Sequence, residues 1–249
     1  MKALVTGATG FVGSHLVEAL QRSQVEVTAL ARSPAKAAVL QAQGIHVIAA
    51  DLHHIDGLRR AAAGQDVIYH VAGMIAARNE AEFFCANRDG TGNLVDAASA
   101  AGRPRFVFVS SLAAGGPAPR GLPLDGTEQP RPVTAYGRSK LAAEDVVRGS
   151  ALPWTIVRPP IVYGPRDREI LKLFRIARLG VAPVFGDGSQ ELSAVHATDL
   201  ARALLAVAGT DSAEGRIYNA CHLEVFTSAA FGRAVGNAMG RSVGTLRIP

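Results

Sequence analysis

The sequence predicts an α/β protein with a doubly wound parallel sheet and a small C-terminal lobe. Over the first 160 residues, short apolar segments alternate with segments of helical periodicity. The apolar segments are hydrophobic throughout rather than at every second position, which is typical of parallel strands buried on both faces. A glycine-rich turn joins the first apolar segment to the first helix, as expected where such a sheet begins.

Each element of the first domain, residues 1–160, follows from this alternation. In the first helix, for example, Leu16, Val17 and Leu20 share one face. The predicted strands are Lys2–Val5, Val25–Leu30, Ile45–Ala49, Asp66–Val71, Arg105–Ser110 and Trp154–Val157. The predicted helices are Ser14–Ser23, Pro34–Gln43, Leu58–Ala63, Ala81–Ala100 and Ala135–Val147.

The remainder of the chain, residues 161–249, lacks the regular alternation of strands and helices predicted for the first domain. It contains a predicted helix at Glu169–Ala177, a Gly-Asp-Gly turn at 186–188 and a second helix at Thr198–Ala208. Arg216–Asn219 is expected to return to the main sheet. We therefore predict that this segment forms a small lobe and contributes to both parts of the fold; the family resemblance given below implies that it is a substrate lobe, incomplete at its C-terminus.

The composition excludes several functional classes. Hydrophobic residues make up 48% of the 249 positions and charged residues 19%, which rules out a disordered chain. No apolar run approaches the roughly 20 residues of a membrane span. The net charge of +5 comes from scattered arginines rather than a basic stripe, so no nucleic-acid partner is expected. Cys85 and Cys221 fit neither a disulfide framework nor a metal site, and we expect a cytoplasmic protein without a metal.

The glycine turn predicts the ligand. Gly7-x-x-Gly10-x-x-Gly13 lies between the first strand and the first helix, where glycines permit a tight bend and a close approach to a diphosphate. This Rossmann arrangement binds dinucleotides, because the helix N-terminus faces the anion. The predicted cofactor contacts in this turn are Gly7, Thr9, Gly10, Phe11 and Val12.

The end of the second strand indicates which nicotinamide cofactor is preferred. NAD sites usually carry an acidic residue there, which bonds the ribose 2′-hydroxyl. This chain has Leu30-Ala31-Arg32-Ser33, and Arg32 is suited to a 2′-phosphate. We therefore expect a preference for NADP(H), with NAD(H) possible; the alternative is that Arg32 is a solvated loop arginine.

Tyr136-x-x-x-Lys140 places a phenol and an ammonium on one helix face. A nearby cation lowers a tyrosine pKa, which would suit Tyr136 to general acid–base chemistry on a carbonyl–alcohol pair. Ser111 and Ser110 end the fifth strand, at the sheet edge where ligands bind in parallel α/β folds.

Together, the glycine turn and Tyr136-x-x-x-Lys140 resemble the short-chain dehydrogenase/reductase superfamily, and specifically its extended branch, the NAD-dependent epimerase/dehydratase family. Within it, the chain is similar to dihydroflavonol-reductase-like and hydroxysteroid-dehydrogenase-like reductases. Further matching stretches are Asp51-Leu52, His70-Val71-Ala72-Gly73, Asn87-x-x-Gly90-Thr91-x-Asn93-Leu94, Arg158-Pro159-x-x-Val162-Tyr163-Gly164-Pro165 and Val195-His196-x-x-Asp199-Leu200.

The resemblance implies roles for the matched positions. Tyr136 would exchange the proton, while Lys140 would tune Tyr136 and hold the nicotinamide ribose. Ser111 would hydrogen-bond the substrate oxygen, and Asn87 would organise a proton-relay water. The remaining implied cofactor contacts are Asp51 and Leu52 at the adenine, Ala72 and Gly73 at the ribose, and Pro159 and Val162 at the nicotinamide.

We therefore expect an NADP(H)-dependent oxidoreductase that moves hydride between nicotinamide and a small carbonyl or alcohol substrate, with a homodimer as a family expectation. A nucleotide-sugar epimerase or dehydratase with tightly bound NAD(P) stays open as an alternative. It is weakened because Ile161 stands where those relatives generally carry an asparagine for the diphosphate. A non-catalytic NADP-binding sensor or assembly factor is the second alternative.

Overall fold

The computed structural model describes residues 1–248, without the side chain of Phe185; Pro249, at the end of the predicted lobe, lies outside the described residues. The chain divides into two compact units. The first consists of residues 1–159 and 198–220, and the second of residues 160–197 and 221–249. Within residues 1–248, no helix is both long enough and apolar enough to cross a membrane.

The first unit is built on a seven-stranded sheet in which every pair of neighbours is parallel, so the predicted fold class is confirmed. The order across the sheet is β3-β2-β1-β4-β5-β6-β10, which reverses direction at β1, as in a doubly wound fold. The strands are β1 (Lys2–Thr6), β2 (Glu26–Ala31), β3 (His46–Ala49), β4 (Val67–His70), β5 (Arg105–Val109), β6 (Trp154–Arg158) and β10 (Arg216–Asn219).

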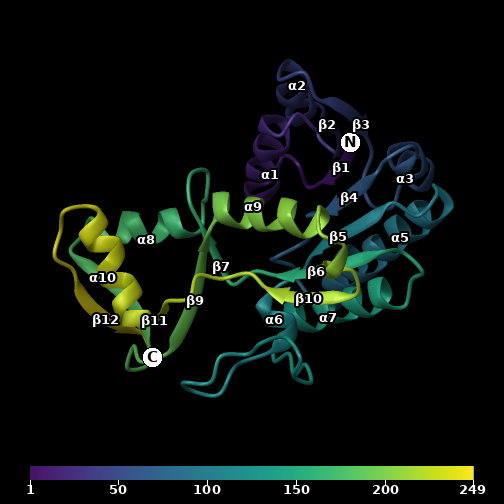
Figure 1. The fold of residues 1–249 in the computed structure, drawn as a ribbon. Coiled ribbons are helices and arrows are strands. Elements are labelled where there is room, and N and C mark those ends of the chain that lie inside the picture. The colour runs from purple at the N-terminus through teal and green to yellow at the C-terminus, as the bar shows by residue number, and fades with distance from the viewer. Residues whose placement is uncertain (249) are drawn as a thin grey trace. The chain divides into compact units, whose positions relative to one another are not determined.

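Helices cover both faces of this sheet, with α3, α5 and α7 on the opposite side from α1 and α2 (Figure 1). The helices of the first unit are α1 (Phe11–Arg22), α2 (Pro34–Ala42), α3 (Ile55–Ala62), α4 (Glu80–Phe83), α5 (Gly90–Ala100), α6 (Leu112–Gly115), α7 (Ala135–Arg148) and α9 (Ala197–Ala208), with a short 3-10 turn η2 (Asp211–Ala213). One apolar cluster packs β4 and β5 against the helices on the face that carries α3, α5 and α7. Ile68, Phe106 and Leu94 belong to this cluster and are fully buried.

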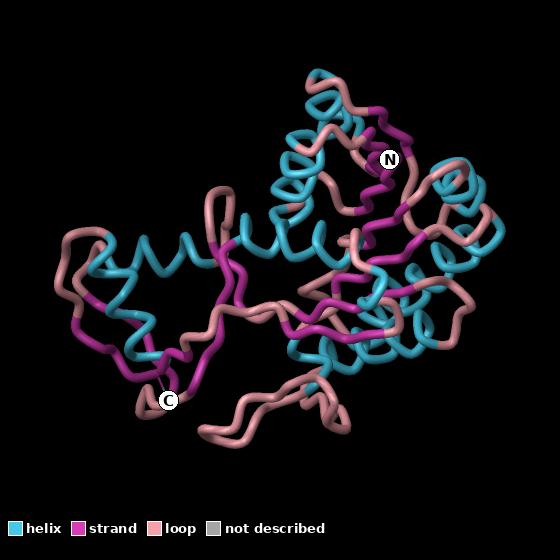
Figure 2. The backbone as a smooth tube through the Cα atoms, in the orientation of Figure 1, coloured by secondary structure: helices cyan, strands magenta, loops and turns pink. Residues whose placement is uncertain are grey.

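The segment predicted as a single helix at Ala81–Ala100 is helical but not uniform. A π-helical turn, η1 (Phe84–Asp89), separates α4 from α5. Apolar spacing does not reveal such a turn, because one extra residue shifts the periodicity only locally. The proline-rich segment between α6 and α7, in contrast, contains no helix or strand among its described residues (Figure 2).

The second unit combines two small sheets with two helices. One sheet has the order β11-β9-β7, and the other pairs β12 with β8. Its elements are β7 (Ile161–Tyr163), α8 (Ile170–Ala177), β8 (Val181–Phe185), β9 (Glu191–His196), β11 (Val225–Thr227), α10 (Ser228–Ala238) and β12 (Gly244–Ile248). Helices α8 and α10 pack against β8 around Ala177, Ala182 and Val235.

Candidate active site

The turn after β1 is shaped by close backbone packing. Gly7 has a φ of 71°, and a Cβ there would lie 2.7 Å from the backbone nitrogen of Ala72. The amide of Gly10 donates to the Gly7 carbonyl at 2.9 Å, and a Cβ at Gly13 would overlap that same carbonyl oxygen. Backbone atoms therefore leave no space for a side chain at Gly7 and Gly13 and little at Gly10, while the predicted approach of a diphosphate to Gly10 stays a prediction.

The N-terminus of α1 follows this turn and suits an anion. Its first residues, Phe11, Val12, Gly13 and Ser14, include no acidic side chain, and Gly10 supplies no side-chain cap. The helix dipole and the first backbone N–H groups therefore favour a negatively charged group. The glycine turn leaves space that a Cβ would fill, and it lies next to a helix N-terminus that carries no acidic side chain. These two features fit the diphosphate of a dinucleotide.

The positions predicted for the adenosine end follow neighbouring strands. Arg32 comes directly after β2 and is exposed, and Asp51 comes shortly after β3. Because β2 and β3 are parallel neighbours, the two residues lie at the same edge of the sheet. The Asp51 carboxylate accepts a hydrogen bond from the His53 amide at 2.8 Å, and Leu52 is half-buried beside it.

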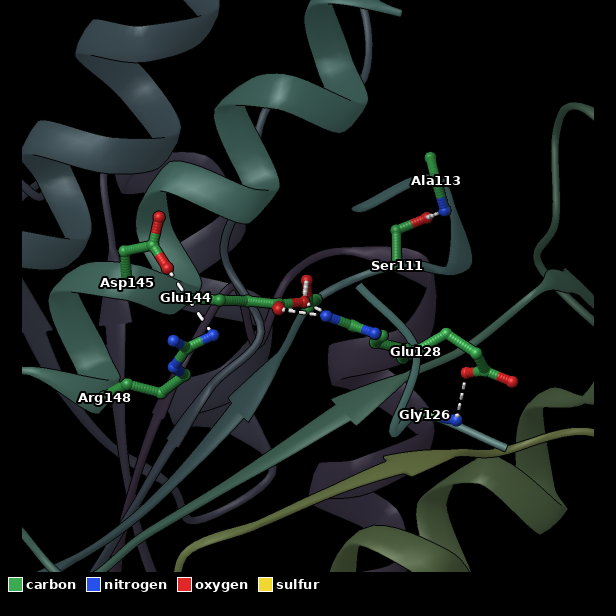
Figure 3. Close-up of polar contacts among 9 residues, drawn as sticks. Ser111, Ala113, Gly126, Glu128, Glu144, Asp145 and Arg148 are labelled. Carbon is green, nitrogen blue, oxygen red and sulfur yellow. Dashed lines mark hydrogen bonds and ion pairs between the residues drawn. The ribbon is translucent and has the colours of Figure 1, made fainter. Parts of the chain in front are cut away.

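Ser111 and Tyr136 are brought together by the packing of α6 against α7. Ser111 caps α6, with its hydroxyl accepting from the Ala113 amide at 3.2 Å (Figure 3). A Cβ at Gly137 would overlap the Ala113 carbonyl oxygen, so glycine after Tyr136 permits this close approach. A hydrogen bond links Ser111 to Tyr136, and the Phe83 ring lies 5.9 Å from the tyrosine ring.

Lys140 lies one turn after Tyr136 on α7 and is buried. Its ammonium donates to the Val109 carbonyl at 2.8 Å and lies 4.2 Å from the centre of the Phe108 ring. Burial lowers the pKa of Lys140 to about 7, and the Glu144 carboxylate partly opposes this shift.

The expected lowering of the Tyr136 pKa by Lys140 is not found. Burial raises the pKa of Tyr136, and the hydrogen bond from Ser111, not the lysine charge, acts in the opposite direction. The physical reason is that the Lys140 ammonium is directed at the end of β5, where it bonds the Val109 carbonyl. The spacing of the two residues on the helix is as predicted, but their electrostatic relation is not.

Asn87 lies on η1 and is buried. Its side-chain oxygen accepts from the Met74 amide at 2.7 Å, and its amide nitrogen donates to the Met74 carbonyl at 3.0 Å and to the Ser139 hydroxyl at 2.9 Å. A Cβ at Gly73 would lie 3.4 Å from the Asn87 oxygen and 3.6 Å from the Lys140 ammonium. Asn87, Gly73 and Lys140 therefore lie close together.

A chain of buried hydrogen bonds ties the segment after β4 to η1. The Ala72 amide donates to Thr6 Oγ1 at 3.2 Å, and Thr6 Oγ1 lies 2.7 Å from His70 Nδ1. His70 Nε2 lies 2.8 Å from Thr91 Oγ1, which donates to the Asn87 carbonyl at 2.5 Å. The single Thr91 proton is used on Asn87, so Nε2 carries the imidazole proton and Nδ1 accepts from Thr6. Burial lowers the pKa of His70 to about 3, which keeps this imidazole neutral.

A buried ion pair lies one further turn along α7. Arg158, at the end of β6, donates to both carboxylate oxygens of Glu144, with Nε 2.8 Å and Nη2 2.5 Å away. Ser110 Oγ donates to the same carboxylate at 2.5 Å. Sequence reasoning missed this cluster, although an acid four residues after Lys140 and an arginine ending an apolar strand were visible signals.

The nicotinamide-pocket positions fall in different units. Pro159 follows β6 in the first unit, where it is buried, and its carbonyl accepts from the Leu112 amide at 3.0 Å. Val162 lies on β7 in the second unit and is half-buried. The other predicted site residues all belong to the first unit. Arg32, Asp51 and Leu52 follow β2 and β3, and the rest lie near the ends of β1, β4 and β5.

The comparison with protein families decides the identity. The NAD dependent epimerase/dehydratase family matches residues 3–221. The chain belongs to this family. It is therefore an enzyme of the extended short-chain dehydrogenase/reductase type, and its cofactor is a nicotinamide dinucleotide.

Among curated relatives, this family member is similar to the ceramide reductase of Caulobacter vibrioides, with 35% identity over 98% of this chain and 73% of the relative. It is 36% identical to a 4-hydroxy-2-methyl-3-oxo-4-farnesyl-3,4-dihydroquinoline-1-oxide ketoreductase of Stigmatella aurantiaca, over 69% of this chain and 53% of that protein. Among solved structures, MoeE5 in complex with UDP-glucuronic acid and NAD has a TM-score of 0.86 at 26% identity, covering 100% of this chain and 85% of that one.

Proposed function

We propose that this family member is an NADP(H)-dependent carbonyl reductase in which Tyr136 is the proton donor. The observation that carries the proposal is the grouping of Ser111, Tyr136 and Lys140 at the end of β5. Support also comes from the ceramide reductase relative, whose similarity extends over 98% of the chain.

Each of these residues has a separate role in the reduction of a ketone to an alcohol. NADPH, when bound, would supply the hydride for the carbonyl carbon. Tyr136 holds a proton on its phenolic oxygen, because burial raises its pKa, and gives that proton to the substrate oxygen. Ser111, whose single hydroxyl proton is directed at Tyr136 in the structure, would turn it to the same substrate oxygen and stabilise the negative charge that develops there. Lys140 and Asn87, both close to Gly73, would hold the ribose and a proton-relay water respectively.

Replacing the phenol tests this assignment. Tyr136→Phe is expected to lower kcat for NADPH-dependent ketone reduction by about 10²–10⁴-fold, because the proton donor is removed while the ring packing is kept. NADPH binding, followed by its fluorescence, should be unchanged. Tyr218→Phe, on strand β10, is the matched control and should keep full activity. Full activity in Tyr136→Phe would refute the mechanism, and no NADPH oxidation by the unmodified protein on a panel of ketones and aldehydes would favour the non-catalytic alternative.

The NADP(H) preference is assigned to Arg32. Arg32 follows β2 in the chain, and neither of its neighbours in the sequence is acidic, which suits a 2′-phosphate. Arg32→Asp should therefore shift the ratio of kcat/KM values for NADPH and NADH toward NADH by at least about tenfold. Arg60→Asp on α3 makes the same change of charge and should leave the ratio unaltered. An unchanged ratio in Arg32→Asp would leave Arg32 as a solvated arginine.

A nucleotide-sugar epimerase is the second candidate, favoured by the UDP-glucose 4-epimerase of Vibrio cholerae, which is 29% identical over 78% of this chain and 60% of that protein. Ile161 at the expected diphosphate position argues against it. Thermal-shift titration with UDP-sugars separates the two functions, since a reductase of the proposed kind should show no stabilisation by them.

A further inference from the structure

His70 is a fully buried histidine whose two ring nitrogens bond side chains from different elements. It is the last residue of β4, and its ring is stacked on that of Phe108 with 5.3 Å between the centroids. Nδ1 faces Thr6, the last residue of β1, and Nε2 faces Thr91 in the first turn of α5. The proposed reduction uses none of these three side chains. Buried polar groups are retained at a cost in desolvation unless each is fully paired, as these are.

The two ends of this line of hydrogen bonds are backbone groups, and they fix its direction. At one end the Ala72 amide can only donate, and at the other end the Asn87 carbonyl can only accept. Thr6 therefore gives its own proton to His70 Nδ1, and Nε2 gives its proton to Thr91. Because the line begins at a peptide N–H, which keeps its proton, it cannot conduct protons to the site. Its role is therefore to hold groups in place.

The Thr6 end of the line holds the glycine turn against the segment after β4. Thr6 directly precedes Gly7, where a Cβ would lie 2.7 Å from the Ala72 nitrogen. The Thr6 hydroxyl accepts a hydrogen bond from that same nitrogen at 3.2 Å. The line thus sets the separation between the turn predicted for the diphosphate and the residue predicted for the ribose.

The Thr91 end of the line holds the backbone of Asn87. A threonine hydroxyl that bonds the carbonyl four residues earlier is a contact that bends helices, and here it lies where η1 joins α5. The Asn87 side chain in turn bonds both the amide and the carbonyl of Met74. Movement of the Asn87 backbone would therefore disturb the contacts of its side chain.

We propose that His70 is a positioning residue that keeps the cofactor turn and Asn87 in fixed relation, through Thr6 on one side and Thr91 on the other. The importance of Asn87 for proton transfer rests on the proposed function; the contacts of His70 do not. Loss of the Thr6 link should weaken NADPH binding, because Ala72 is released. Loss of the Thr91 link should slow the reaction, because Asn87 is released.

Thr6→Val and Thr91→Val each replace one hydroxyl group by a methyl group of similar size. Thr6→Val is expected to raise the Kd for NADPH by about three- to tenfold while kcat changes little. Thr91→Val is expected to lower kcat for ketone reduction by about the same factor while Kd changes little. NADPH fluorescence and steady-state kinetics measure the two constants.

Thr155→Val is the matched control for these variants. Thr155 is buried in β6 of the same sheet and donates one hydrogen bond, to the Ala213 carbonyl at 2.8 Å. Its replacement should lower Tm by a similar amount and change neither Kd nor kcat. Equal effects of all three variants on both constants would overturn the proposal, since a loss of stability alone predicts no division between binding and turnover.

Replacing His70 itself separates the two links. Asparagine places its amide near the position of Nδ1 and keeps a group for Thr6 alone, whereas glutamine reaches the position of Nε2 and keeps a donor for Thr91 alone. His70→Asn should therefore resemble Thr91→Val in Kd and kcat, and His70→Gln should resemble Thr6→Val. Any other pattern in folded variants would refute the role of the imidazole, and if neither variant folds the threonine variants decide.

Amide hydrogen exchange in the protein without NADPH tests the same division and requires no hydride transfer. The Met74 amide should exchange about three- to tenfold faster in Thr91→Val than in Thr155→Val, and the Ala72 amide should do so in Thr6→Val. Unchanged exchange at both amides would overturn the proposal even with ketone reduction intact.

The positioning role and the proposed function can fail separately. A fully active Tyr136→Phe variant would refute the proposed mechanism and leave the exchange result and the NADPH binding result standing. A loss of the division between the threonine variants, with Tyr136→Phe inactive, would refute the role of His70 alone.

Discussion

At the scale of single residues, Lys140 carries an ammonium group into a site where only 3% of the residue is exposed. Its pKa of about 7 in the folded protein is far below the ordinary value of 10.5. Between these values the unfolded chain binds more protons than the folded one, so the contribution of this residue to stability increases with pH. Below about pH 7 the buried Lys140 side chain is charged, and its destabilisation of the folded protein is greatest.

The prediction is a pH-dependent difference between variants. Going from about pH 7 to about pH 9, the free energy of unfolding of the unmodified protein should rise relative to that of Lys140→Met, by up to about 1.4 kcal/mol per pH unit. Urea denaturation at the two pH values measures it. Lys36→Met, at an exposed position on α2, is the control and should run parallel to the unmodified protein. If the free energy of unfolding of Lys140→Met also changes with pH in parallel with that of the unmodified protein, Lys140 does not change its protonation state in this range.

At single positions, the sequence predicts the structure best where one steric requirement determines which residue fits. Gly7 and Gly13 are examples, since backbone atoms occupy the space of any side chain. It predicts less well where several groups compete for one charge. Tyr136 and Lys140 are correctly paired on one helix face, but the Val109 carbonyl that takes the ammonium comes from a distant part of the chain. Helical spacing carries no information about such a partner.

At the scale of elements, the Glu144–Arg158 pair fixes α7 to the end of β6. Both residues are almost completely buried, at 0% and 3% side-chain exposure, and Ser110 ties the end of β5 to the same carboxylate. The strand end that carries Ser111 and the helix that carries Tyr136 and Lys140 are thus joined beneath the site. The pair is expected to act as a positioning device for these three groups.

Glu144→Leu should destabilise the protein by about 3–5 kcal/mol, because it leaves the Arg158 guanidinium buried without a counter-charge. The double variant Glu144→Leu with Arg158→Met should recover much of this loss, since two apolar groups replace the ion pair. Urea denaturation of the four proteins in the cycle gives the coupling energy. A double variant as unstable as the sum of the single ones would show that the pairing itself contributes little.

The strands of the first unit illustrate what apolar runs can predict. The segments from Lys2 to Val157 that were predicted as strands all form strands of the parallel sheet. Burial on both faces gives most of them a continuous apolar sequence, although the edge strand β3 is only half-buried or exposed. Strands β7, β8, β9, β11 and β12 were not predicted. They belong to small sheets, and their pairing partners are distant in the sequence.

At the scale of the whole molecule, the chain leaves the first unit after Pro159 and returns to it for residues 198–220. The returning segment supplies α9, with Leu200 and Leu204 fully buried, and strand β10, which pairs with β6. A chain ending at residue 159 would therefore lack part of its own core and expose the β6 edge.

Residues 1–159 joined by a flexible glycine–serine linker to residues 198–220 should fold cooperatively, whereas residues 1–159 alone should aggregate or melt at a lower temperature. Circular dichroism melting and size-exclusion chromatography measure the difference, with NADPH fluorescence as a test of the glycine turn. Identical behaviour of the two chains would show that α9 and β10 are dispensable for the sheet.

The wide turn η1 places one residue more in its stretch of helix than an α-helix would hold. Glu80, which pairs with Arg138, and Phe83, which contacts the Tyr136 ring, precede this turn, whereas Asn87 lies within it. Because the turn takes up its extra residue locally, deletion of a single residue such as Cys85 would restore ordinary helical winding without rotating the helix before it. Glu80 and Phe83 would keep facing α7, whereas the side chains inside the turn, Asn87 among them, would point in new directions. A one-residue change that turns half of an ordinary α-helix by about 100° would here displace only the residues around Asn87.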